Sequence, residues 1–422
     1  MSNLPDYISS TRMPAPTPDS IVENGKVHFG TFDAPFKNLN LLDAVKPCGN
    51  KMPEFMKPSR LVEWEAFEVH MDEGALISAV YSTGPMGFSI FVWYDKKENK
   101  IYSWRNLVHK KKAHVASQLV DDCCYCKTKT SEYKIENDFL HGKARAKGFT
   151  KGKNGEFTID IRFERISPLA NGVMPLARNK DGSFRNALYS EKDFFKASGT
   201  ITLNGKVYTT NERSVGIIDD HKGYYPFNAH YDWLTTMGQI DDDGVKKYFA
   251  FNLTRNQSVD QHQYNENVIW VDNESFPMPP VVFTHEKGKK KAKTWYIKDE
   301  AGKGIVDIKF EIDQVFYMPI PLLCYYALPY GKISGYVTDT NGKKYVVDGM
   351  IGIGEDKTTH MSKTRQFDGR RAILCVFLLF ALFFTFLPRR EFVLSVHTRT
   401  KTPAAVPPNY LLAVLRALHA SG

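Results

Sequence analysis

Several features that would assign a function directly are missing from this sequence of 422 residues. It contains no phosphate-binding loop, no nucleophile elbow and no metalloprotease motif. The stretch Gly352-Ile353-Gly354 lacks the third glycine and the following helix of a dinucleotide-binding fingerprint. These absences remove the most direct routes from a sequence to a reaction class.

Cysteines are few and irregularly spaced, and they form no disulfide framework. The group Cys123, Cys124 and Cys126 has no second ligand pair at a distance typical of zinc sites, so no bound metal is expected. Residues 1–20 hold no apolar run of the length found in signal peptides. We therefore expect reduced cysteines and a cytoplasmic body that is not secreted.

A basic surface is missing from most of the chain, although the net charge is +9. Residues 362–422 contain nine Lys or Arg and two Asp or Glu, a net charge of +7, which leaves +2 for residues 1–361. The lysine-rich stretches 110–112 and 287–293 each lie between strand-like runs, as solvated hairpin loops do. Bulk charge therefore does not indicate a nucleic-acid partner.

Long amphipathic helices are nearly absent, and short strand-like runs separated by turns dominate the chain from about His28. Asn204-Gly205 joins the runs 200–203 and 206–209, and an Asn-Gly pair supplies the positive φ angles of a type I′ hairpin. A period-2 pattern marks another strand, whose apolar face would be formed by Phe157, Ile159, Ile161 and Phe163. Many short strands at regular spacing predict a mostly β fold of barrel or sandwich type.

The same pattern predicts two β halves. Residues 1–27 read as a flexible lead-in, residues 28–190 as the first half and residues 191–361 as the second, joined through the loop 168–187. Hydrophobic residues make up 42% of the chain and aromatic residues 13%. That composition is sufficient for a substantial core.

Residues 362–422 differ in composition and form an atypical basic tail. Its segment 372–387 is uncharged, and arginine pairs flank it on both sides. As a helix it would span roughly 24 Å, short of a hydrocarbon core of about 30 Å but enough for a thin bilayer. One interpretation is a transmembrane helix that attaches the body to a membrane, and the other is an aberrant C-terminus.

Ionisable and aromatic side chains are densest between Val215 and Gly238. In an extended strand His230 and Asp232 would share a face, because residues i and i+2 do so. A carboxylate beside a histidine stabilises the imidazolium that general acid/base chemistry needs. We therefore name Asp220 and His230 as candidate catalytic residues. The candidate pocket residues of this stretch are Tyr224, Tyr225 and Trp233. The alternative is a purely structural turn that leads into an aromatic core strand.

A resemblance rests on this stretch and on four later ones. Asp220-x-x-Gly223-Tyr224-Tyr225-Pro226 is followed by an aromatic-x-Trp pair and Gly238. Further matches follow in order at residues 251–254, 266–271, 335–337 with 348–349, and 354–356. Together they resemble the domain of unknown function 2804 family over residues 28–358. Tyr231 stands where that family is expected to have Trp, and the basic tail begins where the family is expected to end.

The resemblance implies a fold and a ligand class, but no reaction. The family is distantly similar to two-domain lipocalin-like proteins, among them carotenoid hydratases and natural-product cyclases. That similarity implies paired β-barrel halves around an apolar cavity, with no required cofactor. Within the matched motifs, Asn252, Glu266 and Asn267 are then expected to bind the ligand.

The leading hypothesis is a small apolar molecule bound between or within the halves, with hydration, isomerisation or cyclisation as the candidate acid/base reactions. The alternatives are a non-catalytic carrier and a membrane-attached scaffold that uses residues 372–387. The sequence leaves open whether the body is an enzyme, which ligand it takes and how it oligomerises.

Overall fold

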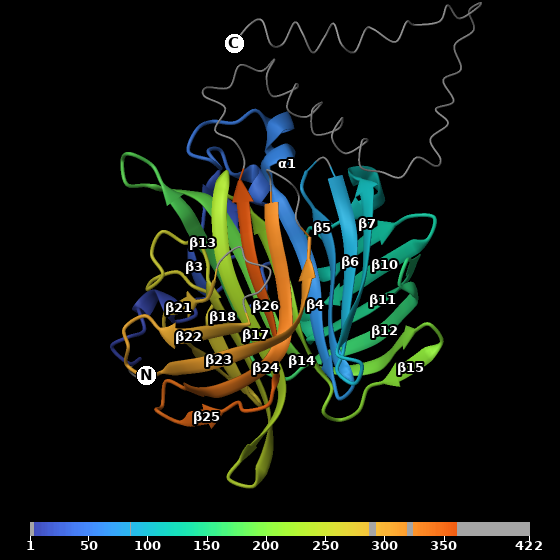
Figure 1. Cartoon of the computed structure of the whole chain (residues 1–422). Helices are drawn as coiled ribbons and strands as arrows, with labels where there is room; N and C mark the ends of the chain where they lie inside the picture. The colour runs from blue at the N-terminus through green and yellow to red at the C-terminus, as the bar shows by residue number, and fades with distance from the viewer. Residues whose placement is uncertain (1–3, 85, 287–292, 319–323, 361–422) are drawn as a thin grey trace, which may run out of the picture. The chain divides into compact units, whose positions relative to one another are not determined.

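Two large antiparallel β-sheets build the described part of the chain (Figure 1). The computed structural model describes residues 4–84, 86–286, 293–318 and 324–360. Helices in these residues are short. They are η1 (Ser10–Arg12), η2 (Leu41–Asp43), η3 (Glu54–Met56), α1 (Lys57–Arg60), η4 (Lys110–Lys112) and η5 (Phe139–His141). The prediction of a mostly β fold with two barrel-like halves is confirmed.

The first sheet has 14 strands. Its central path runs in the order β7 (Lys100–His109), β6 (Met86–Asp95), β5 (Gly74–Ser82), β4 (Val62–Met71), β16 (Val215–Gly223), β14 (Phe184–Leu203), β12 (Gly155–Arg165), β11 (Lys143–Gly152), β10 (Ser131–Asp138), β9 (Val120–Lys127) and β8 (Ala113–His114). Off this path lie β13 (Ala170–Arg178), β15 (Lys206–Thr209) and β3 (Gly30–Phe32). A separate ribbon pairs β1 (Val22–Glu23) with β2 (Lys26–Val27).

The second sheet has 10 strands. Its path is β20 (Glu274–Pro277), β19 (Val268–Val271), β18 (Val245–Arg255), β17 (Asn228–Asp242), β26 (Ile351–His360), β24 (Cys324–Thr338), β23 (Val306–Tyr317), β22 (Thr294–Asp299) and β21 (Val281–Thr284), with β25 (Lys344–Val346) paired to β24. Nearly every pairing in both sheets joins strands that are close in sequence, which is why turn chemistry determines so much of the topology.

Tight turns set the strand register where the sequence predicts them. Asn204 and Gly205 both have positive φ angles, 51° and 84°, and they join β14 to β15 with Leu203 opposite Lys206. In β12 the four alternating apolar residues predicted for one strand face are all buried. These hairpin and strand predictions are therefore confirmed.

Each sheet surrounds an apolar core of its own, and a third apolar cluster lies where the sheets meet. Phe67 and Phe163 stack in the first core with ring centroids 4.0 Å apart. Phe310 lies in the second core. Trp64 of the first sheet and Trp233 of the second share the third cluster. Burying a large apolar side chain contributes about 1.5–3 kcal/mol, so the third cluster stabilises the contact between the sheets.

The chain passes from the first sheet to the second between β16 and β17, at residues 224–227. The predicted boundary after residue 190 falls inside β14, a 20-residue strand of the first sheet. The loop 168–187 has the glycines and prolines of a joint, but most of it belongs to β13 and the start of β14, which are paired within the first sheet. Both sheets belong to one compact unit.

The predicted lead-in and tail differ in how far the structure describes them. In the lead-in, Ile21 is fully buried and Arg12 is 8% exposed, so both pack against the body. The tail 362–422, with its segment 372–387, lies outside the described residues, as do residues 287–292 of the lysine-rich loop. Across the residues that are described, no helix has both the length and the apolar character to cross a membrane.

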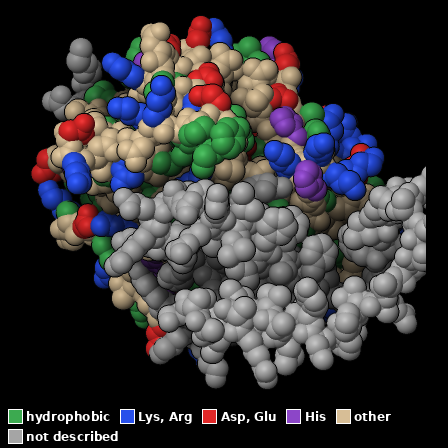
Figure 2. Space-filling model, turned by 90° about the horizontal axis from the view of Figure 1, so that it is seen from above, with side chains coloured by type: hydrophobic (Ala, Val, Ile, Leu, Met, Phe, Trp, Pro, Cys, Tyr) green, Lys and Arg blue, Asp and Glu red, His purple; other side chains and the backbone are tan. Residues whose placement is uncertain are grey.

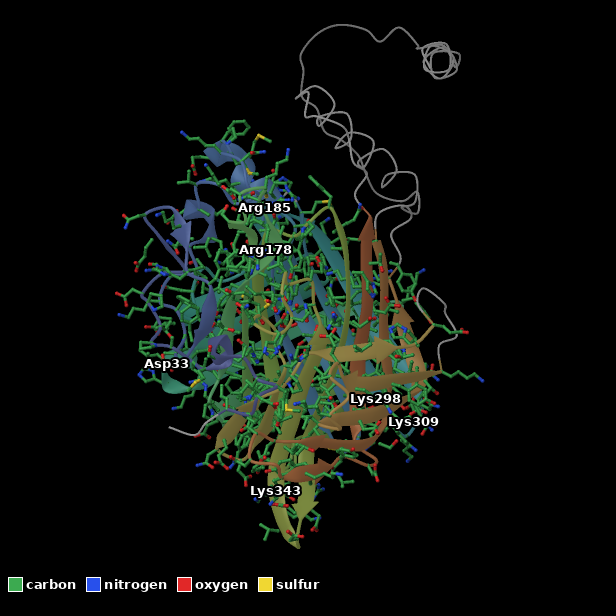
Figure 3. The ribbon with its side chains drawn as sticks, turned by 90° about the vertical axis from the view of Figure 1, so that its left-hand side faces the viewer. Asp33, Arg178, Arg185, Lys298, Lys309 and Lys343 are labelled. Atoms are coloured by element: carbon green, nitrogen blue, oxygen red, sulfur yellow. The ribbon has the colours of Figure 1, made fainter. Side chains whose placement is uncertain are left out.

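The outer faces of the described strands carry charged side chains. Lys298 of β22 and Lys309 of β23 point outward (Figure 3), next to the buried Ile297 and Ile308. Seen from above, side chains of both charge signs lie around a hydrophobic patch (Figure 2). In β22 and β23, this alternation of buried apolar and exposed polar residues leaves one strand face to solvent.

Candidate functional site

Strand β16 carries two different sets of ionisable residues on its two faces. Ile217 packs with apolar residues of the second sheet, whereas Ile218 belongs to the core of the first sheet. Successive side chains of a strand point to opposite faces. Asp219 and His221 therefore lie on the face of Ile217, toward the second sheet, and Asp220 points into the first sheet.

Four charged side chains meet on the face toward the second sheet. Lys192 of β14 lies directly opposite Asp219, and the ammonium and carboxylate groups are in contact. The Nε2 atom of His221 lies 3.0 Å from an Asp219 oxygen and 3.2 Å from a Glu266 oxygen. Lys192 Nζ lies 3.4 Å from Glu266. With His221 protonated, this four-residue ionic cluster contains two cations and two anions.

Polar neighbours hold Glu266 in place. Ser190 donates a hydrogen bond of 3.0 Å to one carboxylate oxygen, and Asn256 donates one of 2.8 Å to the other. Glu266 lies in the connection between β18 and β19, so a residue of the second sheet completes a cluster that begins on the first. Its position depends on the two sheets packing together.

The charged states of the cluster support one another. Burial alone would raise the pKa of Glu266, but His221 and Lys192 lower it to about 2. Burial likewise opposes ionisation of Asp219, yet the same two cations hold its pKa well below the ordinary value. Burial would lower the pKa of His221, and the carboxylates of Asp219 and Glu266 more than compensate, so it is raised. The two carboxylates therefore favour the protonated imidazolium of His221, whereas the ammonium of Lys192, 3.1 Å from the same Nε2, opposes it.

Aromatic rings cover the cluster. Trp64 of β4 stacks on His221 with ring centroids 4.5 Å apart, and its indole N–H donates to Asp219 at 3.2 Å. On its other side Trp64 stacks on Tyr81 at 5.2 Å. The Tyr225 hydroxyl lies 3.3 Å from His221 Nδ1. Burial raises the pKa of Tyr225 well above its ordinary value, so the group is a phenol, not a phenolate, before any ligand binds.

The second sheet supplies the opposite wall. Tyr231 of β17 donates a hydrogen bond of 2.8 Å to Glu355 of β26. Tyr326 of β24 donates to the same carboxylate. The ammonium of Lys357 lies 5.1 Å from the Trp64 ring centroid and 5.6 Å from that of Tyr231, in the range of cation–π contacts. This wall is thus aromatic but also charged.

A cavity that is partly open to solvent lies between these walls, and its empty space, open solvent included, is about 410 Å³. Its lining combines all four members of the ionic cluster with a ring of aromatic side chains. The aromatic members are Trp64, Tyr225, Tyr231 and Trp233. Ligand sites in proteins commonly combine apolar walls with a few convergent polar groups, which is the composition seen in this first cavity.

Three of the predicted ligand-binding residues line the first cavity: Tyr225, Trp233 and Glu266. Asn252 lies behind it and accepts a hydrogen bond of 2.6 Å from the indole of Trp233. Asn267 is fully buried and donates to the Pro279 carbonyl at 2.9 Å. Asn252 and Asn267 therefore support the site from behind.

Tyr224 and Asp220 lie away from the first cavity. Tyr224 is buried in the core of the first sheet. Asp220 is fully buried on the opposite face of β16 from His221, and neither of its carboxylate oxygens has a hydrogen-bond partner among the described residues. Burial raises the pKa of Asp220 to about 7. Glu65, the register partner of Asp220 on β4, has a pKa raised to about 8, mainly by burial.

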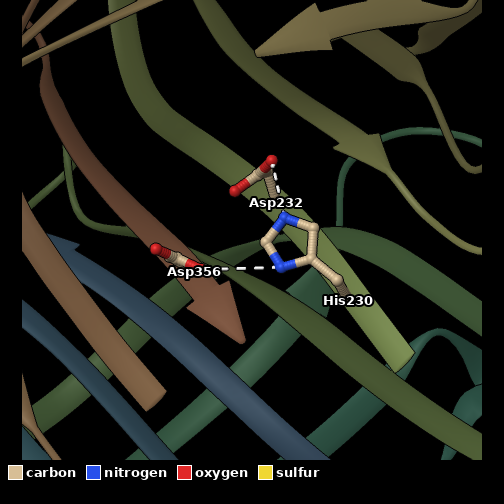
Figure 4. Close-up of side chains that lie close together, drawn as sticks. All are labelled: His230, Asp232 and Asp356. Carbon is tan, nitrogen blue, oxygen red and sulfur yellow. Dashed lines mark hydrogen bonds and ion pairs between the residues drawn. The ribbon is translucent and has the colours of Figure 1, made fainter. Parts of the chain in front are cut away.

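His230 belongs to a different group, shown in Figure 4. Its Nε2 lies 3.2 Å from Asp232, as the i, i+2 spacing predicts, and its Nδ1 lies 3.7 Å from Asp356. His285 Nε2 lies 2.7 Å from the other Asp232 oxygen. The potential ligand atoms of His230, Asp232 and Asp356 lie within 4.8 Å of one another, so this trio could hold a cation. The same geometry is that of a hydrogen-bonded network, in which Thr358 also bonds His230 at 2.8 Å.

The first-sheet members of the ionic cluster, Lys192, Asp219 and His221, were not among the site residues predicted from the sequence. The spacing rule that pairs His230 with Asp232 applies equally to Asp219 and His221, and it would have separated both from Asp220. Lys192 carries no local signal, because it lies within a long strand of mixed composition. Only the antiparallel register of β14 and β16 brings it opposite Asp219.

Comparisons with known proteins identify a family. The model of a family described as a domain of unknown function, DUF2804, matches residues 15–360. No curated protein matches the chain. One solved structure similar to it is that of a putative AttH from Nitrosomonas europaea, with 13% identity and a TM-score of 0.39, covering 71% of this chain and 92% of that one. Another is CghA with Sch210972, with 9% identity and a TM-score of 0.44, covering 84% of this chain and 98% of that one.

Proposed function

This chain belongs to the DUF2804 family, and we propose that it binds a small organic molecule with a flat unsaturated body in the first cavity and transfers a proton to it from His221. The observation that carries this proposal is the buried His221, whose Nε2 lies 3.0 Å from Asp219 and 3.2 Å from Glu266 and which lines a cavity walled by aromatic rings. A buried cation beside such a cavity is suited to proton donation rather than to packing alone.

The geometry suggests the path of the proton. Nε2 of His221 faces the two carboxylates, so the opposite nitrogen, Nδ1, is free to donate to the Tyr225 oxygen 3.3 Å away. The Tyr225 hydroxyl would give its proton to the ligand and take one from the imidazolium. The ligand gains a proton, His221 becomes neutral and Tyr225 is a phenol again. Return of a proton from another ligand carbon, or from an added water, resets His221 and completes an isomerisation, cyclisation or hydration.

Aromatic walls fit the flat body of such a ligand and would stabilise positive charge that develops on it after protonation. The charged members of the lining limit the alternatives. A purely apolar ligand would leave Lys192, Asp219 and Glu266 without polar contact on the cavity side. We therefore refine the predicted apolar ligand to one that also carries polar groups.

Native mass spectrometry tests this proposal. The purified protein is mixed with a metabolite extract, and the retained mass is compared among the wild type and its Trp64→Ala and His221→Gln variants. We expect a retained small molecule in the wild type, its loss in Trp64→Ala, and in His221→Gln retention of an unconverted form. His70→Gln is the matched control, because His70 is also a buried histidine facing the second sheet but does not line the cavity. Equal retention of the same mass in all variants would contradict the proposal.

A carrier is the second candidate function, because every member of the ionic cluster is already paired and needs no reaction to explain it. The same experiment separates the two functions. A carrier returns an unaltered molecule from both the wild type and His221→Gln, whereas an enzyme returns different masses from the two proteins.

A further inference from the structure

A second cavity, of about 590 Å³ including open solvent, adjoins the first. Lys192 and Glu266 line both cavities, so this ion pair stands between them. The remaining walls come from β3, β13, β19 and β20, and from Arg12 in the N-terminal segment. None of the residues predicted from the sequence to bind a ligand, apart from Glu266, belongs to this second cavity.

Arg12 is the unusual member of the second cavity. Its side chain is 8% exposed, and its guanidinium donates to two backbone carbonyls, those of Asn265 and Asn267. Its Nε atom is buried and has no acceptor among the described residues. Within that part of the chain, no carboxylate lies within ion-pair distance of Arg12. Although burial lowers its pKa to about 10, the group remains a cation at neutral pH.

The charge of Arg12 is not balanced by the neighbouring ionic cluster. With His221 protonated, the ionic cluster is neutral on its own, because Lys192 and His221 then offset Asp219 and Glu266. The charge of Glu266 raises the pKa of Arg12. However, Glu266 already accepts hydrogen bonds from Ser190 and Asn256 and pairs with two cations. One positive charge therefore remains uncompensated at the second cavity. A buried charge without a partner is costly, and a guanidinium fork matches the two oxygens of an acid group.

We propose that Arg12 is an anion-recognition residue, and that the ligand of this protein is an organic acid whose acid group binds Arg12 in the second cavity while its flat body extends past Lys192 and Glu266 into the first. This inference rests on the proposed function for the position of the ligand body. It assigns to the N-terminal segment a direct part in ligand specificity.

Two dyes of matched shape test it. Anilinonaphthalene sulfonate is an organic anion, and N-phenylnaphthylamine is the same aromatic body without the sulfonate. Binding of each is measured by fluorescence titration of the full chain for the wild type, Arg12→Gln, Arg12→Lys and Trp64→Ala. Arg162→Gln is the control, because Arg162 is exposed on β12 and loses the same charge.

We expect Arg12→Gln to weaken binding of the sulfonate dye by about ten-fold or more, and binding of the neutral dye by less than about two-fold. Arg12→Lys keeps the charge without the fork, so its loss should be intermediate and again confined to the sulfonate dye. Arg162→Gln should change neither. Trp64→Ala should weaken both dyes, because it removes the wall against which the shared aromatic body lies.

Other results overturn one proposal or both. If both Arg12 variants weaken the two dyes equally, Arg12 is structural and the anion inference fails. It also fails if the wild type does not distinguish the dyes. Unchanged binding of both dyes in Trp64→Ala, with the Arg12 effect intact, removes the proposed function and its ligand path but leaves an anion site at Arg12. If the wild type binds neither dye, both proposals fail.

Discussion

The two faces of strand β16 place similar side chains in opposite electrostatic settings. On one face Asp219 contacts two cations and lines the first cavity. On the other face its neighbour Asp220 is fully buried in the first sheet, without a hydrogen bond to either carboxylate oxygen among the described residues. The pKa of Asp219 is lowered and that of Asp220 is raised to about 7.

The difference teaches that burial alone does not decide the charge of a carboxyl group. Both groups lose hydration, which raises the pKa of each. At Asp219 the direct contacts with Lys192 and His221 outweigh that loss, whereas at Asp220 the attraction of Lys222 and His221 does not. One face of the strand is therefore an ionic cluster, and the other is a site that holds protons.

The largest expected effect comes from removing the charge on each face in turn. Asp219→Asn removes one of the two carboxylates that pair with Lys192 and His221. Breaking a buried pair in this way lowers the free energy of unfolding by about 3–5 kcal/mol. Asp220→Asn replaces a carboxyl that is mostly protonated near pH 6 with a neutral group of the same shape, so the loss should stay within about 1 kcal/mol. Urea denaturation at that pH measures both. Equal losses in the two variants would show that the faces do not differ as described.

The sequence predicts those parts of this comparison that depend on residues close together along the chain. Turn pairs such as Asn204-Gly205 act over two residues, and the strands they join were predicted correctly. The densest motif, around Asp220, marked the right strand. Lys192 and Glu266 could not be assigned to one cluster, because only strand register and sheet packing bring them together. Arg12 lies in a segment whose composition suggests flexibility, and its role depends on contacts more than 250 positions away.

The next effect concerns pH and the proton-holding face. The pKa of Glu65 is raised from 4.5 to about 8, so the folded state holds a proton there that the unfolded chain has released. The stability that this contributes is present below about pH 4.5 and is lost as pH rises through about 8, on the order of a few kcal/mol. Glu65→Gln mimics the protonated group and should flatten the decline of the melting temperature between about pH 5 and pH 8.

Glu136 provides the control for this pH dependence. It lies on β10, where its carboxylate is exposed and pairs with Lys134. Glu136→Gln should leave the pH profile of the melting temperature as it is in the wild type. A wild-type profile that rises over the same range, or one that Glu65→Gln fails to change, would count against a protonated Glu65.

A smaller effect separates two buried histidines that both face the second sheet. Burial lowers the pKa of His70 to about 3, whereas the carboxylates around His221 raise its pKa despite burial. Side-chain NMR titration should show a pKa for His221 above that of an ordinary histidine, and His70 without a transition between about pH 4 and pH 8. Asp219→Asn should lower the pKa of His221 and leave His70 unchanged. A His221 that titrates below an ordinary histidine would remove the buried imidazolium from the proposed function.

The smallest effect is expected where similar ion-pair chemistry occurs in solvent. Arg145 of β11 lies diagonally across from Asp160 of β12, two residues from its register partner. The pair forms two hydrogen bonds, of 2.9 and 2.8 Å, and the side-chain exposures are 29% and 39%. Water competes for both groups, so Asp160→Asn should cost only about 0.2–1 kcal/mol in urea denaturation. Added salt should reduce that cost further, whereas it should scarcely change the cost of Asp219→Asn, because buried pairs are screened much less. If salt affected both variants alike, the ionic cluster on β16 would have to be open to solvent, and its contrast with Asp220 would rest on something other than direct ion pairing.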